Sequence, residues 1–394
     1  MMASASFAPP LVVHIIYSLD TGGLENGLVN IINHMEPDAY RHKIICLGYC
    51  NPAFSERIKR DDIEIVALNK GDGFDFPMML ELRRILKRWK PAIIHSRNIA
   101  ALEMQLVTLG IGSIKRIHGE HGRDIGDLNG QNWKYNALRK VSSLWVDRFI
   151  TVSKDMEQWL QQDVGIPRQK LTQIYNGVDL TKFMPRETSV NTESSMPEQP
   201  PIIVGTVGRL DPVKAQNLLI DAVAKLVSLS SHNRDHLKLW IIGDGPEKQV
   251  LQAQAEQLGI GDLVWFAGDR SDVPELLQQM DIFVLPSLAE GLSNTLLESM
   301  ASGKAVVASL VGGNPELIDD DVRGKTFQSR DLESLTKILQ QLMNSAEERN
   351  RLGVNARKFI EERFSWSRCV QDYRSQYDAL LQGRAQDKYL KEIH

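Results

Sequence analysis

The sequence predicts an α/β protein with two doubly wound domains, each built on a parallel β-sheet covered by helices on both faces. Three observations support this prediction. The chain has 394 residues, too many for one ordinary hydrophobic core. Short apolar runs rich in Val and Ile alternate with segments of helical periodicity, which is typical of βαβ units. This alternation stops at a polar stretch, residues 186–201, and then begins again.

The apolar runs predict thirteen strands, seven before the polar stretch and six after it. The first seven are expected at residues 11–17, 42–48, 63–68, 92–96, 114–120, 148–153 and 171–176. The other six are expected at residues 202–208, 237–243, 263–268, 281–287, 304–309 and 324–329. Helical periodicity lies between them, for example at residues 27–35 and 78–89.

These elements predict a domain order along the chain. Residues 1–185 are expected to form an N-terminal Rossmann-like domain and residues 202–370 a C-terminal one. Residues 186–201, rich in Ser, Thr, Glu and Pro, are expected to be an exposed linker. Residues 371–394 are helical by pattern and are expected to pack back toward the N-terminal domain. Because ligands bind at the carboxyl ends of strands in such sheets, functional motifs should follow the strands.

The composition excludes several classes of protein. With 42% hydrophobic and 24% charged residues, the chain is typical of a globular protein. Its three cysteines form no CxxC pair and predict neither a disulfide framework nor a zinc site. No segment approaches the ~20 apolar residues that a membrane span requires. Residues 1–10 are interpreted as a short tail rather than a signal peptide, and a cytoplasmic location is expected.

The charge is unevenly shared between the two halves. The net charge is −4, about +3 through Pro185 and about −7 after it, which argues against a nucleic-acid-binding protein. Basic residues concentrate in "LRRILKRWK" at residues 82–90, where apolar residues recur at helical spacing. This pattern favours an amphipathic helix packed on the sheet. It leaves open a peripheral contact with anionic headgroups at the inner face of a membrane.

Two motifs follow strands of the first half. "DTGGLENG" places Gly22 and Gly23 after the first strand, where a backbone without Cβ atoms lets a ligand approach a helix N-terminus. A turn needed only to begin the helix is an equally good interpretation. "RIHGEHGRD" follows the fifth strand, where His121 is expected at the strand end and His118 inside the strand. Strand alternation and the lack of further ligands argue against a metal site here.

The second half carries the motifs for an anionic ligand. "GRLDPVK" follows the eighth strand, and its turn can bring Arg209 and Lys214 to one diphosphate, although two unrelated surface cations remain an alternative. Glycine turns at Gly243 and Gly268 follow the next two strands.

"LPSLAEGLSNTLLESM", residues 285–300, holds two carboxylates seven residues apart. It is expected to be a loop carrying Glu290, followed by a helix capped by Ser293 or Asn294 that carries Glu298. The N-terminus of this helix is expected to be an anion site.

Together and in this order, the motifs resemble those of retaining glycosyltransferases of family 4, which have the GT-B fold. The resemblance runs from "DTGGLE" through "EHG", "VSK", "IYNGVD", "VGRLDPVK", "IIGDGPE" and "FAGDRSDV" to "PSLAEGLSNTLLESMASGKAVVAS". The spacing of the two glutamates is its most specific element. The chain is also similar to sugar transferases of exopolysaccharide clusters associated with the exosortase and PEP-CTERM sorting system. The fold implied is two Rossmann-like domains facing across a cleft.

The resemblance implies roles for individual residues. The catalytic residues implied are His121, Glu290, Arg209 and Lys214, with Glu290 on the hydroxyls of the donor sugar and Glu298 on the ribose. The donor-binding residues implied are Gly22, Gly23, Arg209, Lys214, Gly243, Gly268, Arg270, Glu290, Gly291, Leu292, Ser293, Asn294 and Glu298. The acceptor-binding residues implied are Gly23, Arg123 and Asn176. One departure concerns Leu24, Glu25 and Asn26, where many members carry a basic residue after the two glycines.

The resemblance also implies the substrates. A nucleotide-diphosphate sugar, taken to be a UDP-sugar, would donate to a glycan or lipid-linked acceptor in exopolysaccharide or cell-surface glycan synthesis, without a metal or other cofactor. The alternatives are a nucleotide-sugar epimerase or hydrolase on the same fold, and a non-catalytic nucleotide-sugar-binding protein. A nicotinamide dehydrogenase is disfavoured because no GxGxxG fingerprint is present. The sequence leaves the donor, the acceptor, the linkage and the oligomeric state open.

Overall fold

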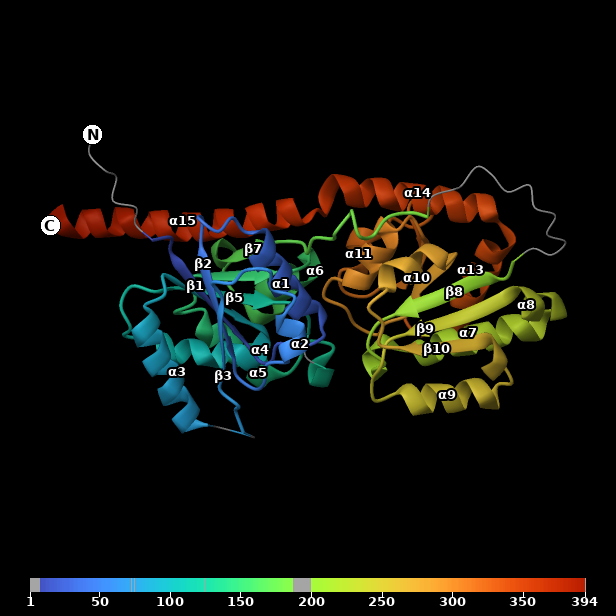
Figure 1. Cartoon of the computed structure of the whole chain (residues 1–394), viewed down its shortest axis with the longest axis horizontal. Helices are drawn as coiled ribbons and strands as arrows, with labels where there is room; N and C mark the ends of the chain where they lie inside the picture. The colour runs from blue at the N-terminus through green and yellow to red at the C-terminus, as the bar shows by residue number, and fades with distance from the viewer. Residues whose placement is uncertain (1–7, 72, 74, 124, 187–199, 394) are drawn as a thin grey trace. The chain divides into compact units, whose positions relative to one another are not determined.

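The structure, a computed structural model, describes residues 8–71, 73, 75–123, 125–186 and 200–393. The chain divides into two compact units (Figure 1). Unit 1 comprises the chain up to Gly177 and from Trp366 onward, and unit 2 comprises Val178–Ser365. Of the expected linker, residues 187–199 lie outside the described residues.

Unit 1 is built on a seven-stranded, all-parallel sheet in the order β3-β2-β1-β4-β5-β6-β7. Its strands are β1 (Leu11–Ile16), β2 (Arg41–Cys46), β3 (Glu64–Ala67), β4 (Ile93–Arg97), β5 (Lys115–Glu120), β6 (Arg148–Thr151) and β7 (Leu171–Gln173). Its helices are α1 (Gly23–His34), α2 (Pro52–Ser55), α3 (Phe76–Trp89), α4 (Asn98–Leu102), α5 (Trp133–Ser142), α6 (Lys154–Trp159) and α15 (Trp366–Ile393). The strand order reverses between β1 and β4, so a switch point lies there.

The two faces of this sheet are covered by different helices. On one face, Val12 and Ile93 pack with Ile31 of α1 and with Tyr373 and Tyr377 of α15. On the other face, β1 and β4 pack against α3 through residues that include Met78, Leu82, Ile85 and Leu86. The apolar residues of the basic stretch 82–90 therefore point into the core, as expected for an amphipathic helix on the sheet.

Unit 2 repeats the plan with a six-stranded parallel sheet in the order β10-β9-β8-β11-β12-β13. Its strands are β8 (Ile202–Val207), β9 (Leu237–Ile242), β10 (Val264–Gly268), β11 (Ile282–Leu285), β12 (Ala305–Ser309) and β13 (Lys325–Phe327). Its helices are α7 (Gln216–Leu229), α8 (Ser231–His236), α9 (Lys248–Gln257), α10 (Val273–Gln279), α11 (Asn294–Ala301), α12 (Asn314–Leu317), α13 (Leu332–Asn344) and α14 (Ala346–Arg363). The switch point of this sheet lies between β8 and β11.

Unit 2 packs α7, α9 and α13 against one face of its sheet through a core that includes Leu219, Leu251 and Leu335. Residues 178–185 belong to this unit because their backbone bonds to α14 and to Phe364: Arg357 donates to the Phe183 carbonyl, and the Val178 N–H donates to the Phe364 carbonyl. The division thus falls at Gly177, earlier in the chain than residue 185.

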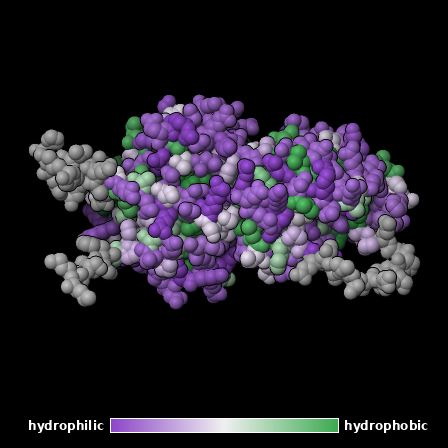
Figure 2. Space-filling view, turned by 90° about the horizontal axis from the view of Figure 1, so that it is seen from above, coloured by the Kyte–Doolittle hydropathy of each residue, from purple (hydrophilic) through white to green (hydrophobic). Residues whose placement is uncertain are grey.

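Within the described residues, all thirteen expected strands are present, and two doubly wound parallel sheets are confirmed. The surface seen in Figure 2 is largely hydrophilic, with hydrophobic residues in small groups. In the described part of the chain, no helix combines the length and apolar character needed to cross a bilayer.

Candidate active site

The turn after β8 brings a predicted cation to a predicted carboxylate. Asp211 begins this turn, and its side chain accepts the N–H of Val213. The turn carries Lys214, whose Nζ donates to Oε1 of Glu290 at 2.7 Å. Lys214 follows β8 and Glu290 follows β11, so the pair lies at the switch point of unit 2, where ligands of such sheets bind.

Glu290 is held from several sides. Ser287 donates to the same Oε1 at 2.6 Å, and the side chain of Glu290 is only 7% exposed. The loop after β12 passes close to its backbone, because a Cβ at Gly312 would lie 1.8 Å from the Glu290 carbonyl oxygen. Lys214 remains 28% exposed, so solvent reaches this ion pair from the side of the lysine. A ligand that carries an anion and hydroxyl groups can therefore compete for both partners.

Helix α11 begins as the sequence predicts. Ser293 is its N-cap, and its hydroxyl accepts the N–H of Leu296. Glu298 lies one turn after Asn294 on the same face of the helix. Leu292 and Ser293 are buried, so donor contacts at these two positions would use backbone groups. The Gly291 carbonyl accepts the N–H of Gly313, which ties this loop to the one after β12.

The other predicted donor-binding residues of unit 2 lie at neighbouring strand ends. Gly243 donates its N–H to the Gly268 carbonyl, and a Cβ at Gly243 would lie 2.1 Å from the Gly208 carbonyl oxygen. Arg209 points largely into solvent, 70% exposed, with its Nε 4.0 Å from Asp211. Arg270 is engaged by Asp272 through two hydrogen bonds, so an anion would have to displace that carboxylate.

In unit 1, Gly22 precedes α1 as predicted, but the space where its Cβ would lie is filled by the side chain of Glu25. A Cβ at Gly22 would lie 2.2 Å from Oε2 of Glu25. Gly23 is the first residue of α1, and the Glu25 carboxylate folds back over its N-terminus. Burial raises the pKa of Glu25. The space next to Gly22 is therefore filled by the end of the side chain of Glu25, a residue for which the sequence predicted no role.

His121 lies directly after β5, and its backbone N–H donates to the side chain of Asn98 at 2.9 Å. Its Nε2 is buried and, among the described residues, has no hydrogen-bond partner. Burial, with a further contribution from the charge of Arg97, lowers the pKa of His121 to about 3. His121 is therefore a neutral imidazole at physiological pH, able to hydrogen-bond or polarise a sugar hydroxyl but not to carry a positive charge.

His118 and Glu120 are satisfied inside the protein. Arg139 donates to Glu120 at 2.6 Å, and His118 bonds to both Ser96 and Glu120. Burial alone would raise the pKa of Glu120, but Arg139 and His118 outweigh it and lower this pKa to about 2. In the part of the chain that the structure describes, no group of three or more His, Cys, Asp or Glu is arranged to hold a metal ion.

The predicted acceptor-binding side chains of unit 1 have protein partners. Arg123 pairs with Asp155 at 3.0 Å and lies over the ring of Trp159. Asn176 is 9% exposed.

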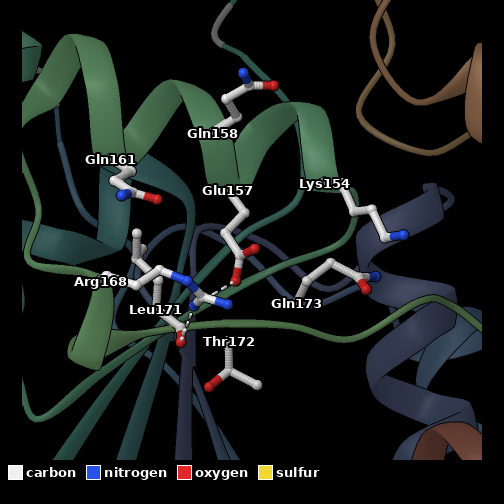
Figure 3. Close-up of a pocket in the computed structure, with 8 residues that line it drawn as sticks. All are labelled: Lys154, Glu157, Gln158, Gln161, Arg168, Leu171, Thr172 and Gln173. Carbon is white, nitrogen blue, oxygen red and sulfur yellow. Dashed lines mark hydrogen bonds and ion pairs between the residues drawn. The ribbon is translucent and has the colours of Figure 1, made fainter.

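An open cavity of 530 Å³ lies beside β7 and α6, and none of the predicted site residues lines it (Figure 3). Its walls carry Lys154, Gln158, Gln161 and Gln173 together with an ion pair between Arg168 and Glu157.

Two residues at strand ends were missed by sequence reasoning. Ser287 binds Glu290 directly, and its place at the end of β11 was the available signal. Arg97 ends β4 beside the switch point of unit 1 and is 1% exposed. The sequence offered no signal for Arg97, because only the strand order places the end of β4 at the switch point.

Comparison with known proteins decides the family. Residues 21–182 match the family described as Glycosyltransferase Family 4, and residues 190–359 match the family described as Glycosyl transferases group 1. The chain belongs to glycosyltransferase family 4. This confirms the family resemblance drawn from the motifs, whereas the exosortase-associated subgroup stays a prediction.

Two curated relatives match most of this chain. N-acetyl-alpha-D-glucosaminyl L-malate synthase of Bacillus anthracis is 28% identical over 91% of this chain and 88% of its own length. MMP alpha-(1->4)-mannosyltransferase of Mycolicibacterium hassiacum is 26% identical over 84% of this chain and 80% of its own length.

Solved structures share the fold. Anabaena Alr3699/HepE, solved in complex with UDP and glucose, has a TM-score of 0.79 at 20% identity and covers 93% of this chain and 99% of its own. Sucrose-phosphate synthase of Thermosynechococcus elongatus also has a TM-score of 0.79, at 18% identity, over 95% of this chain and all of its own. The fold of the glycosyltransferase is therefore GT-B, as predicted.

Proposed function

We propose that this glycosyltransferase moves a sugar from a UDP-sugar to a glycan or lipid-linked acceptor with retention of anomeric configuration, in exopolysaccharide or cell-surface glycan synthesis. The observation that carries the proposal is the contact between Lys214 and Glu290 at the switch point of unit 2. A cation for a diphosphate and a carboxylate for sugar hydroxyls lie there within hydrogen-bonding distance of one another. The complex of Anabaena Alr3699/HepE with UDP and glucose supports the choice of a UDP-sugar.

The chemistry follows from these groups. As the bond between the anomeric carbon and the diphosphate breaks, negative charge develops on the diphosphate, which Lys214, Arg209 and the N-terminus of α11 stabilise. The acceptor oxygen attacks the anomeric carbon on the side that the diphosphate leaves, and the acceptor proton passes to the departing phosphate oxygen. Glu290 holds the sugar hydroxyls, and neutral His121 hydrogen-bonds the sugar. We propose that these cations replace a metal, so a chelator should leave turnover unchanged.

The proposal is tested first by donor binding. UDP or a UDP-sugar at 100 times its dissociation constant should add roughly 2.7 kcal/mol of stability and raise the melting temperature. ADP and GDP at the same concentration serve as controls. If no nucleoside diphosphate shifts the melting temperature, the proposed donor class is wrong.

Turnover tests the role of Lys214. Because one well-aimed donor to a developing charge is worth roughly 3–4 kcal/mol, Lys214→Ala should lower kcat about a hundredfold or more. Lys225→Ala is a matched control, since Lys225 also pairs with a glutamate but lies on α7 away from the strand ends. Equal rates for the two variants would remove the assignment. The configuration of the product, read by NMR, tests retention.

Whether the reaction requires an acceptor distinguishes the alternative functions. An epimerase or hydrolase on this fold would alter or cleave the donor without an acceptor, whereas a transferase releases nucleotide at full rate only when the acceptor is present. A non-catalytic binding protein would show the thermal shift and no turnover.

We also propose that unit 1 contacts anionic lipid through the exposed face of α3. Phe76 and Leu80 are exposed at its start, and Arg84, Lys87 and Arg88 are exposed further along the same stripe. Apolar insertion would use Phe76 and Leu80, because the apolar residues of 82–90 are buried or packed against the core. The protein should sediment with phosphatidylglycerol vesicles and not with phosphatidylcholine vesicles, and Lys87→Glu with Arg88→Glu should abolish this. Equal sedimentation of variant and wild type would exclude the contact.

A further inference from the structure

A buried polar cluster lies on the face of the unit 1 sheet that α15 covers. His95 and Arg97 project from alternate positions of β4 onto this face, and His14 reaches it from β1. Arg97 donates to Nδ1 of His14 at 2.9 Å, and Nε2 of His14 bonds to Nδ1 of His42 at 2.9 Å. Among the described residues, Nε and Nη2 of Arg97 have no hydrogen-bond partner, and the charge of Glu25 also acts on this guanidinium. Buried polar groups without partners are uncommon in native proteins, and a catalytic role is one explanation for them.

Gly119 makes room for two imidazoles of this cluster. It lies beside Arg97 in the register between β5 and β4. A Cβ at this position would lie 2.9 Å from Nε2 of His121 and 3.2 Å from Nε2 of His95. The two ring nitrogens therefore border the same space next to Gly119. Within the described residues, neither nitrogen has a hydrogen-bond partner. The orientation of the His95 ring sets one wall of the space that Gly119 leaves open.

The terminal helix fixes the ring of His95. The hydroxyl of Tyr377, on α15, bonds to Nδ1 of His95 at 2.9 Å, and both residues are fully buried. Tyr373 lies one turn earlier on the same side of α15, and its ring also packs near His95. Its hydroxyl, however, is buried without a hydrogen-bond partner among the described residues. Both tyrosines of this helix thus pack near the His95 ring, with centroid distances of 5.8 Å for Tyr373 and 6.0 Å for Tyr377, but only Tyr377 bonds to His95. The hydroxyl of Tyr377 also interacts with Arg97.

We propose that Tyr377 is a positioning residue for His121: its hydrogen bond to His95 fixes the ring that borders the same space at Gly119 as His121, and so sets how His121 meets the donor sugar. Burial, with a further contribution from the charge of Arg97, lowers the pKa of each of these imidazoles and keeps the cluster neutral. The inference rests on the role proposed above for His121. It assigns to α15 a function in the transfer step in addition to covering the sheet.

The matched pair Tyr377→Phe and Tyr373→Phe tests this proposal. Each change removes one hydroxyl and keeps the ring, so packing is preserved. Because a misplaced catalytic group can cost up to a hundredfold in rate, Tyr377→Phe should lower kcat about tenfold with less than a twofold change in the KM for the donor. Tyr373→Phe should leave both constants within about twofold of wild type. Equal kcat values for the two variants would overturn the proposal.

A double-mutant cycle tests whether Tyr377 acts through His121. In a His121→Ala background, Tyr377→Phe should change kcat less than about twofold, because its effect has already been removed. A tenfold loss in both backgrounds would show that Tyr377 acts independently of His121 and would overturn the inference.

A spectroscopic measurement separates this inference from the proposed function. In protein labelled with ¹⁵N at histidine, the ring resonances of His121, identified by their loss in His121→Ala, should shift in Tyr377→Phe and not in Tyr373→Phe. This result needs no substrate, so it stands even if no sugar transfer is found. Unchanged His121 resonances in Tyr377→Phe would overturn the positioning role.

Discussion

At the scale of single residues, the two glutamates of residues 285–300 differ in what holds them. Glu290 is on a loop and already pairs with Lys214 and Ser287. Glu298 is half-buried, more than one turn into α11. Glu290 lies on a loop beside Lys214, so it can adjust to the charge that develops on the diphosphate during transfer. Glu298 lies on a helix and is better suited to hold the ribose, which does not change in the reaction. We therefore expect Glu298 to affect mainly donor binding and Glu290 to affect mainly the rate of transfer.

The first prediction concerns Glu298→Gln. The amide keeps the shape of the side chain but has one acceptor oxygen and no charge, so a hydrogen bond to the ribose diol is weakened. Hydrogen bonds to charged groups contribute roughly 1.5–3 kcal/mol, so the donor should bind about tenfold more weakly, with kcat changed less than about twofold. Isothermal titration with UDP and initial rates at saturating donor measure the two effects. Unchanged donor affinity would contradict a role for Glu298 in holding the ribose.

Sequence reasoning selected Lys214 and Glu290 separately, but their contact was beyond it. The two residues are 76 positions apart, and only the pairing of β8 with β11 brings them together. Arg97 was missed for a related reason, since "HSRN" contains no local motif and only the strand order places it beside the switch point of unit 1. Local patterns identify chemical types, whereas neighbours across a sheet depend on topology.

At the scale of elements, the strands were predictable because parallel strands buried on both faces form continuous apolar runs. α3 was predictable because its apolar residues recur at helical spacing. The turns were harder to predict, since glycines that favour ligand approach and glycines that relieve contacts within the protein look alike in sequence. Gly22 faces Glu25, and Gly312 faces the backbone of Glu290. Which atoms lie close to each glycine depends on the tertiary structure and cannot be read from the local sequence.

The second prediction concerns the loop that holds Glu290. Gly312 has a φ of +51°, and a Cβ there would lie 1.8 Å from the Glu290 carbonyl oxygen. Gly312→Ala should therefore lower stability by roughly 1–3 kcal/mol and displace Glu290, which weakens donor binding. Gly259→Ala is the control, since Gly259 has a similar φ of +69° with no atom within 4 Å of the added Cβ. The control should lose stability only. If both variants bind UDP equally well, the loop does not position Glu290.

At the scale of the whole molecule, the two units repeat one fold but differ in their buried ionisable groups. Among the described residues of unit 1, four histidines have lowered pKa values: His14, His42, His95 and His121. Burial is the largest cause for each, and the charge of Arg97 contributes to all four. In unit 2, His232 and His236 are not buried.

The third prediction is that acid unfolds unit 1 before unit 2. A buried neutral histidine has a folded pKa below its unfolded value of about 6.5, so between these values the unfolded state binds more protons. The stability that these groups contribute is complete above pH 6.5 and falls as the pH drops, by about 1.4 kcal/mol per histidine per pH unit. Hydrogen exchange followed by mass spectrometry at pH 7 and pH 5, corrected for intrinsic rates, should show peptides from residues 8–177 losing protection before peptides from residues 200–365. Simultaneous loss, or earlier loss in unit 2, would mean that the buried histidines of unit 1 do not control its acid stability.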